Sequence, residues 1–250
     1  MPDHRLEIRN LTVSYKRLPA VHHLSLDLIC GSCVGLLGPN GAGKTSLLKA
    51  LVGLVPIESG SILFHGQEQP RTLSEIAYLP QRSAIDWDFP ITVREMVEMG
   101  RYQSLGWWRS FQPGDRQEVN RALEAMDLVD LAERQISALS GGQQQRAFLA
   151  RSLAQKAHVF LLDEPFAGLD KPTQEHLSET IRKLAQGGNL VIASHHDLKS
   201  VRDLFDYVIL LNGELVAFGE TSDVLSDDNI RRTFRTHVFS GVTHEPGIAI

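Results

Sequence analysis

Apolar and polar residues alternate near the start of the chain, as in LEIRNLTVSY and LSLDLI, from Leu6 to about Ile29. An alternation with a period of two residues places one face of a strand against a core and the other face in water. Turn residues lie between these stretches. The pattern therefore predicts antiparallel strands that form a small N-terminal β layer.

Three later stretches are apolar throughout and short, which is typical of strands that are buried on both faces. They are CVGLLG, which begins at Cys33, VFLLD (Val159 to Asp163) and LVIAS (Leu190 to Ser194). A glycine-rich loop and a helical pattern from about Lys44 to Val52 follow the first, and a helical pattern around Gln174 to Ala185 separates the other two. Buried strands that alternate with helices predict an α/β fold with a largely parallel sheet.

The stretch between the first and second buried strands has a different period, because its apolar residues recur at spacings of three and four. We interpret residues 91–156 as a helical lobe inserted into a core that consists of residues 1–90 and 157–228. Together these parts are expected to form a single domain, residues 1–228. Residues 229–250 show little periodicity and are expected to be a C-terminal tail.

The composition narrows the class of protein. The chain has 250 residues, 42% of them hydrophobic, and a net charge of −5 from 25 basic and 30 acidic residues. Neither sign forms a long run, so a nucleic-acid-binding surface is not expected. No apolar stretch approaches the roughly 18 to 20 residues that span a bilayer, and the N-terminus lacks the apolar core of a signal peptide. We therefore expect a soluble protein that stays in the compartment where it is made.

The two cysteines, Cys30 and Cys33, form a C-x-x-C pattern. Such a pair can be redox-active or supply half of a metal site, but a tetrahedral site needs further ligands, and no second C-x-x-C exists. In the interpretation that we favour, Gly31 and Ser32 make a hairpin turn between two buried strands, and the thiols are packing residues in a reducing cytosol.

A phosphate-binding loop is the first strong functional signal. Residues 38–45 match the pattern G-x-x-x-x-G-K-S/T between a buried strand and a helix. The glycines let backbone N–H groups point inward, Lys44 supplies a positive charge for the β- and γ-phosphates, and the Thr45 hydroxyl can bind Mg²⁺. The residues expected to contact the nucleotide here are Gly38, Pro39, Asn40, Gly41, Ala42, Gly43, Lys44, Thr45 and Ser46.

Two adjacent acids end the second buried strand. Asp163 lies where ligands gather in α/β sheets, and its carboxylate can hold Mg²⁺ through a water molecule. Glu164 can act as the base for an attacking water molecule or can position that water. Two such acids are also common in turns, but the phosphate loop upstream favours the catalytic interpretation.

A second anion site is indicated at LSGGQ, Leu139 to Gln143. Ser140 suits a helix N-cap, and the positive end of the following helix points toward the two glycines. With this pentapeptide the chain resembles the ATP-binding subunits of ABC transporters, from about Leu6 to Leu225. The resemblance implies a P-loop NTPase core with an N-terminal antiparallel β layer and an inserted helical lobe. It also implies ATP and Mg²⁺ as cofactors and ATP hydrolysis. The LSGGQ pentapeptide is the signature of the family, and the resemblance implies a homodimer in which each phosphate loop closes on the partner's signature. The signature residues implied to touch ATP are Ser140, Gly141, Gly142 and Gln143.

Further site residues follow from the resemblance alone. Tyr15 is similar to the aromatic residue on which the family stacks adenine, although a lone strand tyrosine is often only a packing residue. Gln81 is similar to the glutamine that touches Mg²⁺ and relays the nucleotide state to the helical lobe. Asp170 ends a loop that faces the other subunit, and His196 corresponds to the γ-phosphate contact. The adjacent His195 leaves the register of that histidine open, and a His-His pair can also bind a metal ion.

The segment from Gln81 to Phe111 resembles the branch of the family that imports zinc, manganese or iron. This similarity implies polytopic permease subunits as partners and, indirectly, an extracytoplasmic solute-binding protein. It places the chain at the cytoplasmic face of the plasma (inner) membrane, peripheral through the permease. Trp107 and Trp108 suit a surface that docks on the permease, but they could equally cap the core of the helical lobe.

Four other functions have to be compared with metal import. The ATPases of ferric-siderophore and cobalamin importers are very similar in sequence. Soluble ABC ATPases of DNA repair or translation usually carry two cassettes or a long coiled coil, and this chain has neither. A P-loop kinase or GTPase leaves LSGGQ unexplained. Metal binding by the tail histidines, among them His237 and His244, lacks ligand spacing.

Overall fold

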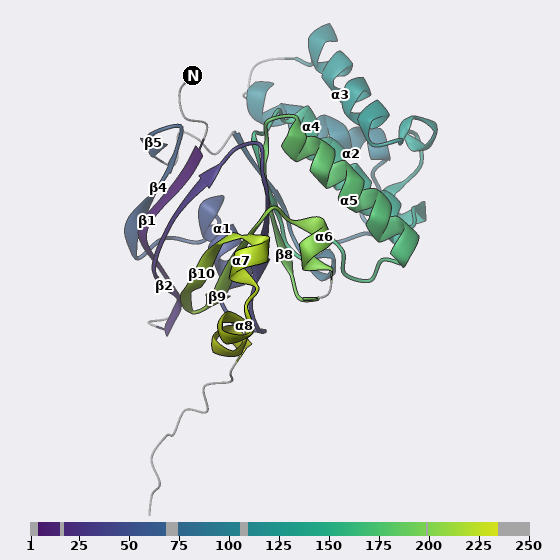
Figure 1. Cartoon of the computed structure of the whole chain (residues 1–250). Helices are drawn as coiled ribbons and strands as arrows, with labels where there is room; N and C mark the ends of the chain where they lie inside the picture. Colours follow the sequence, from purple (N-terminus) through teal and green to yellow (C-terminus); the bar gives the residue numbers. More distant parts are fainter. Residues whose placement is uncertain (1–4, 16–17, 69–74, 106–109, 199, 235–250) are drawn as a thin grey trace, which may run out of the picture.

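Two β-sheets organise the chain, and the computed structural model describes residues 5–15, 18–68, 75–105, 110–198 and 200–234 (Figure 1). The strands of the first sheet are β1 (Arg5–Tyr15), β2 (Leu18–Ile29), β4 (Ser59–Phe64) and β5 (Gln67–Glu68), in the order β2-β1-β4-β5. Those of the second are β3 (Cys33–Leu37), β6 (Ile76–Leu79), β7 (Val159–Leu162), β8 (Leu190–His195), β9 (Tyr207–Asn212) and β10 (Glu214–Glu220), in the order β10-β9-β3-β8-β7-β6.

The first sheet is the predicted N-terminal β layer. β1 pairs antiparallel with both β2 and β4, which confirms that prediction. Alternate residues of β2 such as Leu24 and Leu28 are buried, as the period of two requires. Helix α1 (Lys44–Leu51) lies between the two sheets, and its Leu47 and Leu51 belong to the same hydrophobic cluster as the strands on either side.

The second sheet is largely parallel, as predicted. β6, β7, β8, β3 and β9 run in one direction, and β10 runs antiparallel beside β9. Helices α5 (Lys171–Gln186) and α6 (Val201–Leu204) cover the face opposite α1 (Figure 1). Side chains of β3 alternate accordingly, since Val34 packs in the cluster with α1 and Leu37 in the cluster with α5. Parallel strands place all their carboxyl ends at one edge, where ligands bind in such folds.

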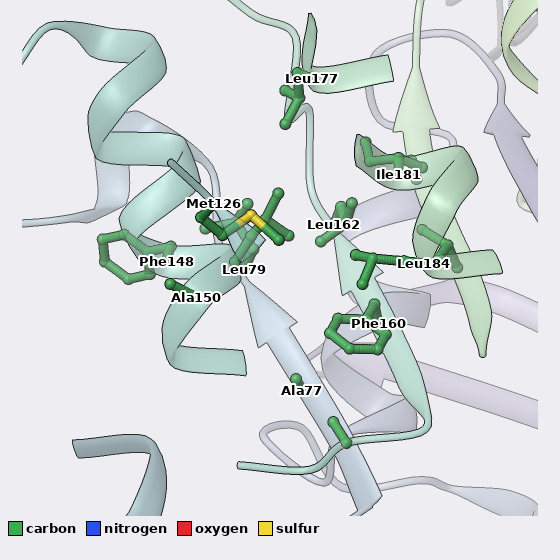
Figure 2. Close-up of a cluster of buried hydrophobic side chains, with 14 of the residues drawn as sticks. Ala77, Leu79, Met126, Phe148, Ala150, Phe160, Leu162, Leu177, Ile181 and Leu184 are labelled. Atoms are coloured by element: carbon green, nitrogen blue, oxygen red, sulfur yellow. The ribbon is translucent and has the colours of Figure 1, made fainter. Parts of the chain in front are cut away.

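The predicted helical lobe consists of three main helices at one end of the sheet (Figure 1). They are α2 (Val93–Leu105), α3 (Pro113–Ala125) and α4 (Gly141–Ala154), with 3₁₀ turns at Val129–Leu131 and Ile136–Ala138. A further 3₁₀ turn, Arg82–Ala84, precedes the lobe. Figure 2 shows how the lobe packs on the core: Met126 and Phe148 lie with Leu79 and Leu162 of the strands and Leu177 of α5 in one buried cluster. The lobe and the core therefore share apolar packing next to the strand ends.

The prediction of a hairpin turn at Gly31 and Ser32 is wrong. β2 belongs to the first sheet and β3 to the second, so the turn connects two sheets and does not pair its flanking strands. β3 is apolar on both faces, and it pairs with the parallel strands β8 and β9 instead. Both cysteines are free thiols, and burial raises the pKa of Cys30 to about 11 and that of Cys33 to about 12. Protonated, largely buried thiols are consistent with a packing role.

The described chain ends in a helix. After the short helix α7 (Thr221–Val224), helix α8 (Asp227–Phe234) continues beyond residue 228, and its Thr233 is fully buried. Ordered structure therefore extends six residues into the stretch that the sequence assigns to the tail. Trp107, Trp108, His237 and His244 lie outside the described residues. Among the helices that the structure describes, none has both the length and the apolar character needed to span a bilayer.

Candidate nucleotide-binding site

The carboxyl ends of four parallel strands bring the predicted site segments to one edge of the second sheet. The phosphate loop, residues 38–46, follows β3, Gln81 follows β6, Asp163 and Glu164 follow β7, and His196 follows β8. The strands are paired up to or near their last residues, so these segments leave the sheet side by side. The Tyr15 backbone ends β1, but its side chain lies outside the described part of the chain.

The phosphate loop ends at the amino terminus of α1, where no side chain caps the helix. Its first N–H groups are thus available to an anion, and the helix dipole adds partial positive charge there. Gly43 is the N-cap residue in the left-handed region at φ +95°, and a Cβ atom added to it would lie 2.2 Å from the Ala20 carbonyl oxygen. Only glycine fits this position, because both its backbone conformation and the close approach of β2 exclude a side chain.

Lys44 is held inside the loop by carbonyl oxygens. Its Nζ donates to the oxygen of Gly38 at 2.7 Å and of Pro39 at 3.0 Å, and the residue is only 8% exposed. Burial lowers the pKa of its ammonium group, while the nearby charges of Glu164 and Asp163 act in the opposite direction. A buried cation with only neutral acceptors gains most from an anionic partner, and a polyphosphate chain is such a partner.

A serine connects the two acids that follow β7. Ser194 Oγ donates to Asp163 Oδ1 at 2.8 Å and accepts the N–H of Glu164 at 2.7 Å. Asp163 is 2% exposed, and its other oxygen lies 3.5 Å from the hydroxyl of Tyr78. The Glu164 backbone is in the left-handed region at φ +51°, which is uncommon for a residue with a side chain and often marks a functional site. Sequence reasoning placed Ser194 only at the end of a strand and missed this role.

The residues assigned to Mg²⁺ offer oxygen atoms. Thr45 supplies a hydroxyl, Gln81 an amide oxygen and Asp163 a carboxylate, which are the ligand types that Mg²⁺ prefers. Within the described ranges, neither the Thr45 hydroxyl nor the Gln81 amide is engaged in a hydrogen bond, and both residues are half-buried. Asp163 is fixed by Ser194. This donor set therefore fits a hard divalent cation.

The segment after β6 connects the site to the helical lobe through an arginine that sequence reasoning did not single out. Arg82 Nη2 donates to Gln144 Oε1 of α4 at 3.0 Å, and its carbonyl accepts the Trp87 Nε1–H at 2.9 Å. Trp87 packs edge-on against Phe148 of the same helix, with ring centroids 5.4 Å apart. The residue after Gln81 is therefore connected to α4 by a hydrogen bond.

The signature residues begin α4 and form a capping box. Ser140 Oγ accepts the Gln143 N–H at 3.4 Å, and Gln143 Oε1 accepts the Ser140 N–H at 2.9 Å. Both side chains thus stabilise the helix end within this chain. Among the described residues, no hydrogen bond joins the signature to the phosphate loop of the same chain. The structure does not bring these two predicted halves of the site together in one subunit.

Gly142 also packs closely within the chain. A Cβ atom added to Gly142 would lie 2.1 Å from Cγ2 of Thr173, in the first turn of α5. Asp170 is the N-cap of α5, and its carboxylate accepts the Thr173 N–H at 3.0 Å. Hydrogen bonds from the Thr173 side chain and from this N–H lower the pKa of Asp170. The predicted partner-facing loop and the signature are therefore in contact through Thr173.

We expect Gly142→Ala to destabilise the isolated subunit by about 1–3 kcal/mol, because Thr173 is stiff at χ1 and cannot turn away freely. Urea unfolding without nucleotide measures this loss. Thr173→Ser removes the clashing methyl group and should restore most of the stability of the Gly142→Ala variant. An unchanged midpoint in Gly142→Ala, or no recovery in the double variant, would show that the contact with Thr173 does not require glycine.

The two adjacent histidines occupy different environments. His195, the last residue of β8, is 7% exposed and lies edge-on to the rings of Phe166 and Phe205, whereas His196 is exposed. Burial, with a smaller contribution from His196, lowers the pKa of His195. An exposed ring at the strand edge suits a contact with a bound phosphate, which favours His196 for that role.

The lowered pKa of His195 predicts a loss of stability in acid. The unfolded chain binds a proton at this histidine near pH 6.5, before the folded chain does. The contribution of the neutral ring is therefore complete above about pH 6.5 and is lost as pH falls through the lower folded-state pKa. Urea unfolding between pH 7.5 and 5 should show a smaller decline in His195→Phe than in the wild type. His158→Gln, at an exposed position, is the control, and equal declines in all three proteins would contradict this assignment.

The ABC transporter family model matches residues 21–167. The manganese transport system ATP-binding protein MntB of Bacillus subtilis is 41% identical over 229 residues, which is 92% of each chain. A metal transport system ATP-binding protein of Chlamydia pneumoniae is 44% identical, covering 91% of this chain and 88% of the relative. The zinc transport system ATP-binding protein TroB of Treponema pallidum is 40% identical, covering 94% and 88%.

Solved structures agree with this fold. A chain of an inward-facing ABC transporter superimposes with a TM-score of 0.81 at 30% identity, covering 93% of this chain and 89% of the other. The ADP conformation of an ATP-binding cassette gives a TM-score of 0.80, covering 92% of this chain and 97% of the other. At 22% identity the second match supports the fold alone.

Proposed function

Because the chain belongs to the ABC transporter family and is one of its ATPase subunits, we propose that it drives the import of a divalent metal cation, with manganese or zinc as the cargo. The observation that supports this cargo is the set of relatives named for manganese, metal and zinc transport, at 40–44% identity over 91–94% of the chain. The same names favour a metal ion over a ferric siderophore or cobalamin, and a transporter over a soluble ABC ATPase.

ATP hydrolysis at this site depends on charge neutralisation and on the position of one water molecule. Lys44 and the N–H groups of the phosphate loop bind the β- and γ-phosphates of ATP. Glu164, held by the Ser194 hydroxyl at its backbone, accepts a proton from the attacking water or orients that water. His196 contacts the γ-phosphate from the adjacent strand end. Tyr15 stacks on adenine.

The proposal also includes a bound Mg²⁺ ion. Thr45 and Gln81 would hold the ion directly and Asp163 would hold it through water, and the ion neutralises phosphate charge when bound. The hydrogen bond from Ser194 orients the Asp163 carboxylate. Tyr78, 3.5 Å from the second carboxylate oxygen, limits its rotation from the other side.

A two-fold dimer completes the site. Ser140 to Gln143 present a helix amino terminus that has no anionic partner in the described part of the chain. In a two-fold arrangement each chain supplies this surface to the ATP bound at the other chain's phosphate loop. Asp170, next to the signature through Thr173, then lies at the dimer interface. ATP stabilises the closed dimer, and loss of the γ-phosphate contacts reopens it.

The membrane partner is proposed to be a polytopic permease, which works with an extracytoplasmic solute-binding protein. The chain would lie at the cytoplasmic face of the plasma (inner) membrane, held by that permease. On the helical lobe, Met99 and Tyr102 of α2 are 41% and 56% exposed. They are three residues apart on one helix, so they present apolar surface on the same face. Such a face on the lobe suits a permease contact.

The test is purification of the tagged chain from its native membranes in mild detergent, followed by reconstitution into liposomes. We expect a polytopic membrane protein to be recovered in equal amount, and ATP to drive uptake of Mn²⁺ or Zn²⁺ into the vesicles. Glu164→Gln should yield the same complex without uptake. A chain that stays soluble and dimerises on ATP without a membrane protein would contradict the transport function. Uptake of a ferric siderophore or cobalamin alone would contradict the cargo.

A further inference from the structure

The segment that carries His196 is folded back on itself by a buried side chain. His195 Nε2 lies 2.8 Å from Ser200 Oγ, and the same hydroxyl lies 3.0 Å from Asp197 Oδ2 and 3.2 Å from the Asp197 carbonyl oxygen. Both groups of Asp197 are acceptors, and in the tautomer that carries Nε2–H the imidazole donates to the serine while the serine proton points to Asp197. The His195 side chain also has a hydrogen bond to the Asp197 backbone. These bonds connect His195, which precedes His196 in the chain, with Asp197, which follows it.

The His195 ring is itself held on two sides. Its centroid is 5.5 Å from that of Phe166 and 5.8 Å from that of Phe205, with edge-on geometry in both cases. Phe166 lies two residues after Glu164, and the ring of Phe205 packs so closely on β3 that a Cβ atom added to Gly35 would lie 2.8 Å from it. His195 is therefore anchored to the backbone that carries the proposed base and to the strand that leads into the phosphate loop.

A cavity borders His195 and Ser200. It has a volume of about 390 Å³, and His195 and Ser200 line it together with α5 and α6, including Ser178, Arg182 and Leu204. Next to this cavity, hydrogen bonds connect His195, Ser200 and Asp197 to one another.

We propose that His195 is a positioning residue for ATP hydrolysis. Through Ser200 and Asp197 it fixes the exposed His196 imidazole toward the γ-phosphate, and it touches neither the nucleotide nor the attacking water. The proposal rests on the role of His196 given above. A misplacement of about 1 Å in such a group can reduce a reaction rate by about 100-fold. His195 thus affects turnover rather than ATP affinity.

Two variants remove the connection at different points. His195→Phe keeps the aromatic packing on Phe166 and Phe205 but removes the N–H donor, and Ser200→Ala removes the shared hydroxyl. We expect each to lower kcat for ATP by about 10- to 100-fold and to leave KM for ATP within a factor of about two, because the phosphate loop is unchanged. The double variant should be no slower than His195→Phe alone, because that change already removes both the contact with Ser200 and the direct contact with the Asp197 backbone. His195→Gln, which keeps an N–H donor, should recover part of the rate.

Glu179→Gln is the control for the cavity, since this exposed residue lines it without a hydrogen bond in the described structure; it should turn over like the wild type. His196→Ala separates the two proposals. If His196→Ala is inactive while His195→Phe and Ser200→Ala keep wild-type kcat, the positioning role is overturned and the site assignment stands. If His196→Ala keeps wild-type turnover, the proposed role of His196 fails, and the positioning role fails with it. Multiplicative losses in the double variant, or a parallel loss of ATP affinity, would also overturn the positioning role.

Discussion

Replacement of Glu164 by glutamine is expected to reduce ATP hydrolysis by a factor on the order of 10² to 10⁴, the usual contribution of a general base. The amide has the same size as the carboxylate but cannot accept a proton from water. The backbone N–H of residue 164 would still donate to Ser194 Oγ, so the strained backbone of this residue keeps its support. ATP binding and ATP-dependent association of two chains should therefore persist. Phosphate release measures the first effect, and light scattering with ATP measures the second.

Glu175→Gln provides the matched control, because Glu175 is an exposed acid on α5. It should hydrolyse ATP at the wild-type rate. Wild-type turnover in Glu164→Gln would remove Glu164 from the catalytic role. If Glu164→Gln loses both turnover and ATP-dependent association, Glu164 acts in ATP binding. The proposal that Glu164 serves hydrolysis while Lys44 serves phosphate binding would then be wrong.

Three of the four strand ends that form the site could be predicted from the sequence, because β3, β7 and β8 each lie in a short apolar run followed by polar residues. The strand β6, which leads to Gln81, was not predicted. β3 and β7 match the predicted runs to within one residue, and β8 continues one residue further, to His195. Once these strands are parallel, their carboxyl ends must share an edge. That is why the sequence could place the phosphate loop and Asp163 together, whereas His196 was assigned from the family resemblance alone.

Contacts between distant segments could not be predicted in this way. The bond from Ser194 to Asp163 joins residues 31 positions apart, and the bond from Arg82 to Gln144 joins residues 62 apart. No periodic pattern of apolar residues along the chain predicts either pair. The turn at Gly31 shows the same limit, because its local sequence suits a hairpin, whereas the partner of β3 is decided by burial on both faces. Local patterns specify elements, and tertiary packing selects their partners.

Replacement of Lys44 by methionine is expected to weaken ATP binding by about 10- to 150-fold, the equivalent of a hydrogen bond to a charged group worth about 1.5–3 kcal/mol. Methionine keeps much of the apolar stem but loses the ammonium group that donates to the Gly38 and Pro39 carbonyls. Titration with ATP and with ADP by calorimetry measures the loss. Lys49→Met, at a half-buried position in the last turn of the same helix, should bind both nucleotides with nearly wild-type affinity.

Stability without nucleotide distinguishes a binding role for Lys44 from a folding role. The folded chain bears the desolvation cost of this ammonium group, which is the main cause of its lowered pKa, and gains only two carbonyl contacts in return. Removing the charge should therefore leave the free energy of unfolding unchanged or slightly higher. A folded Lys44→Met variant that binds ATP like the wild type would contradict the phosphate-binding role. A variant that unfolds without nucleotide would instead make Lys44 a structural residue of the loop. The desolvation cost of its ammonium group would then be offset by contacts within the nucleotide-free protein and not by ATP.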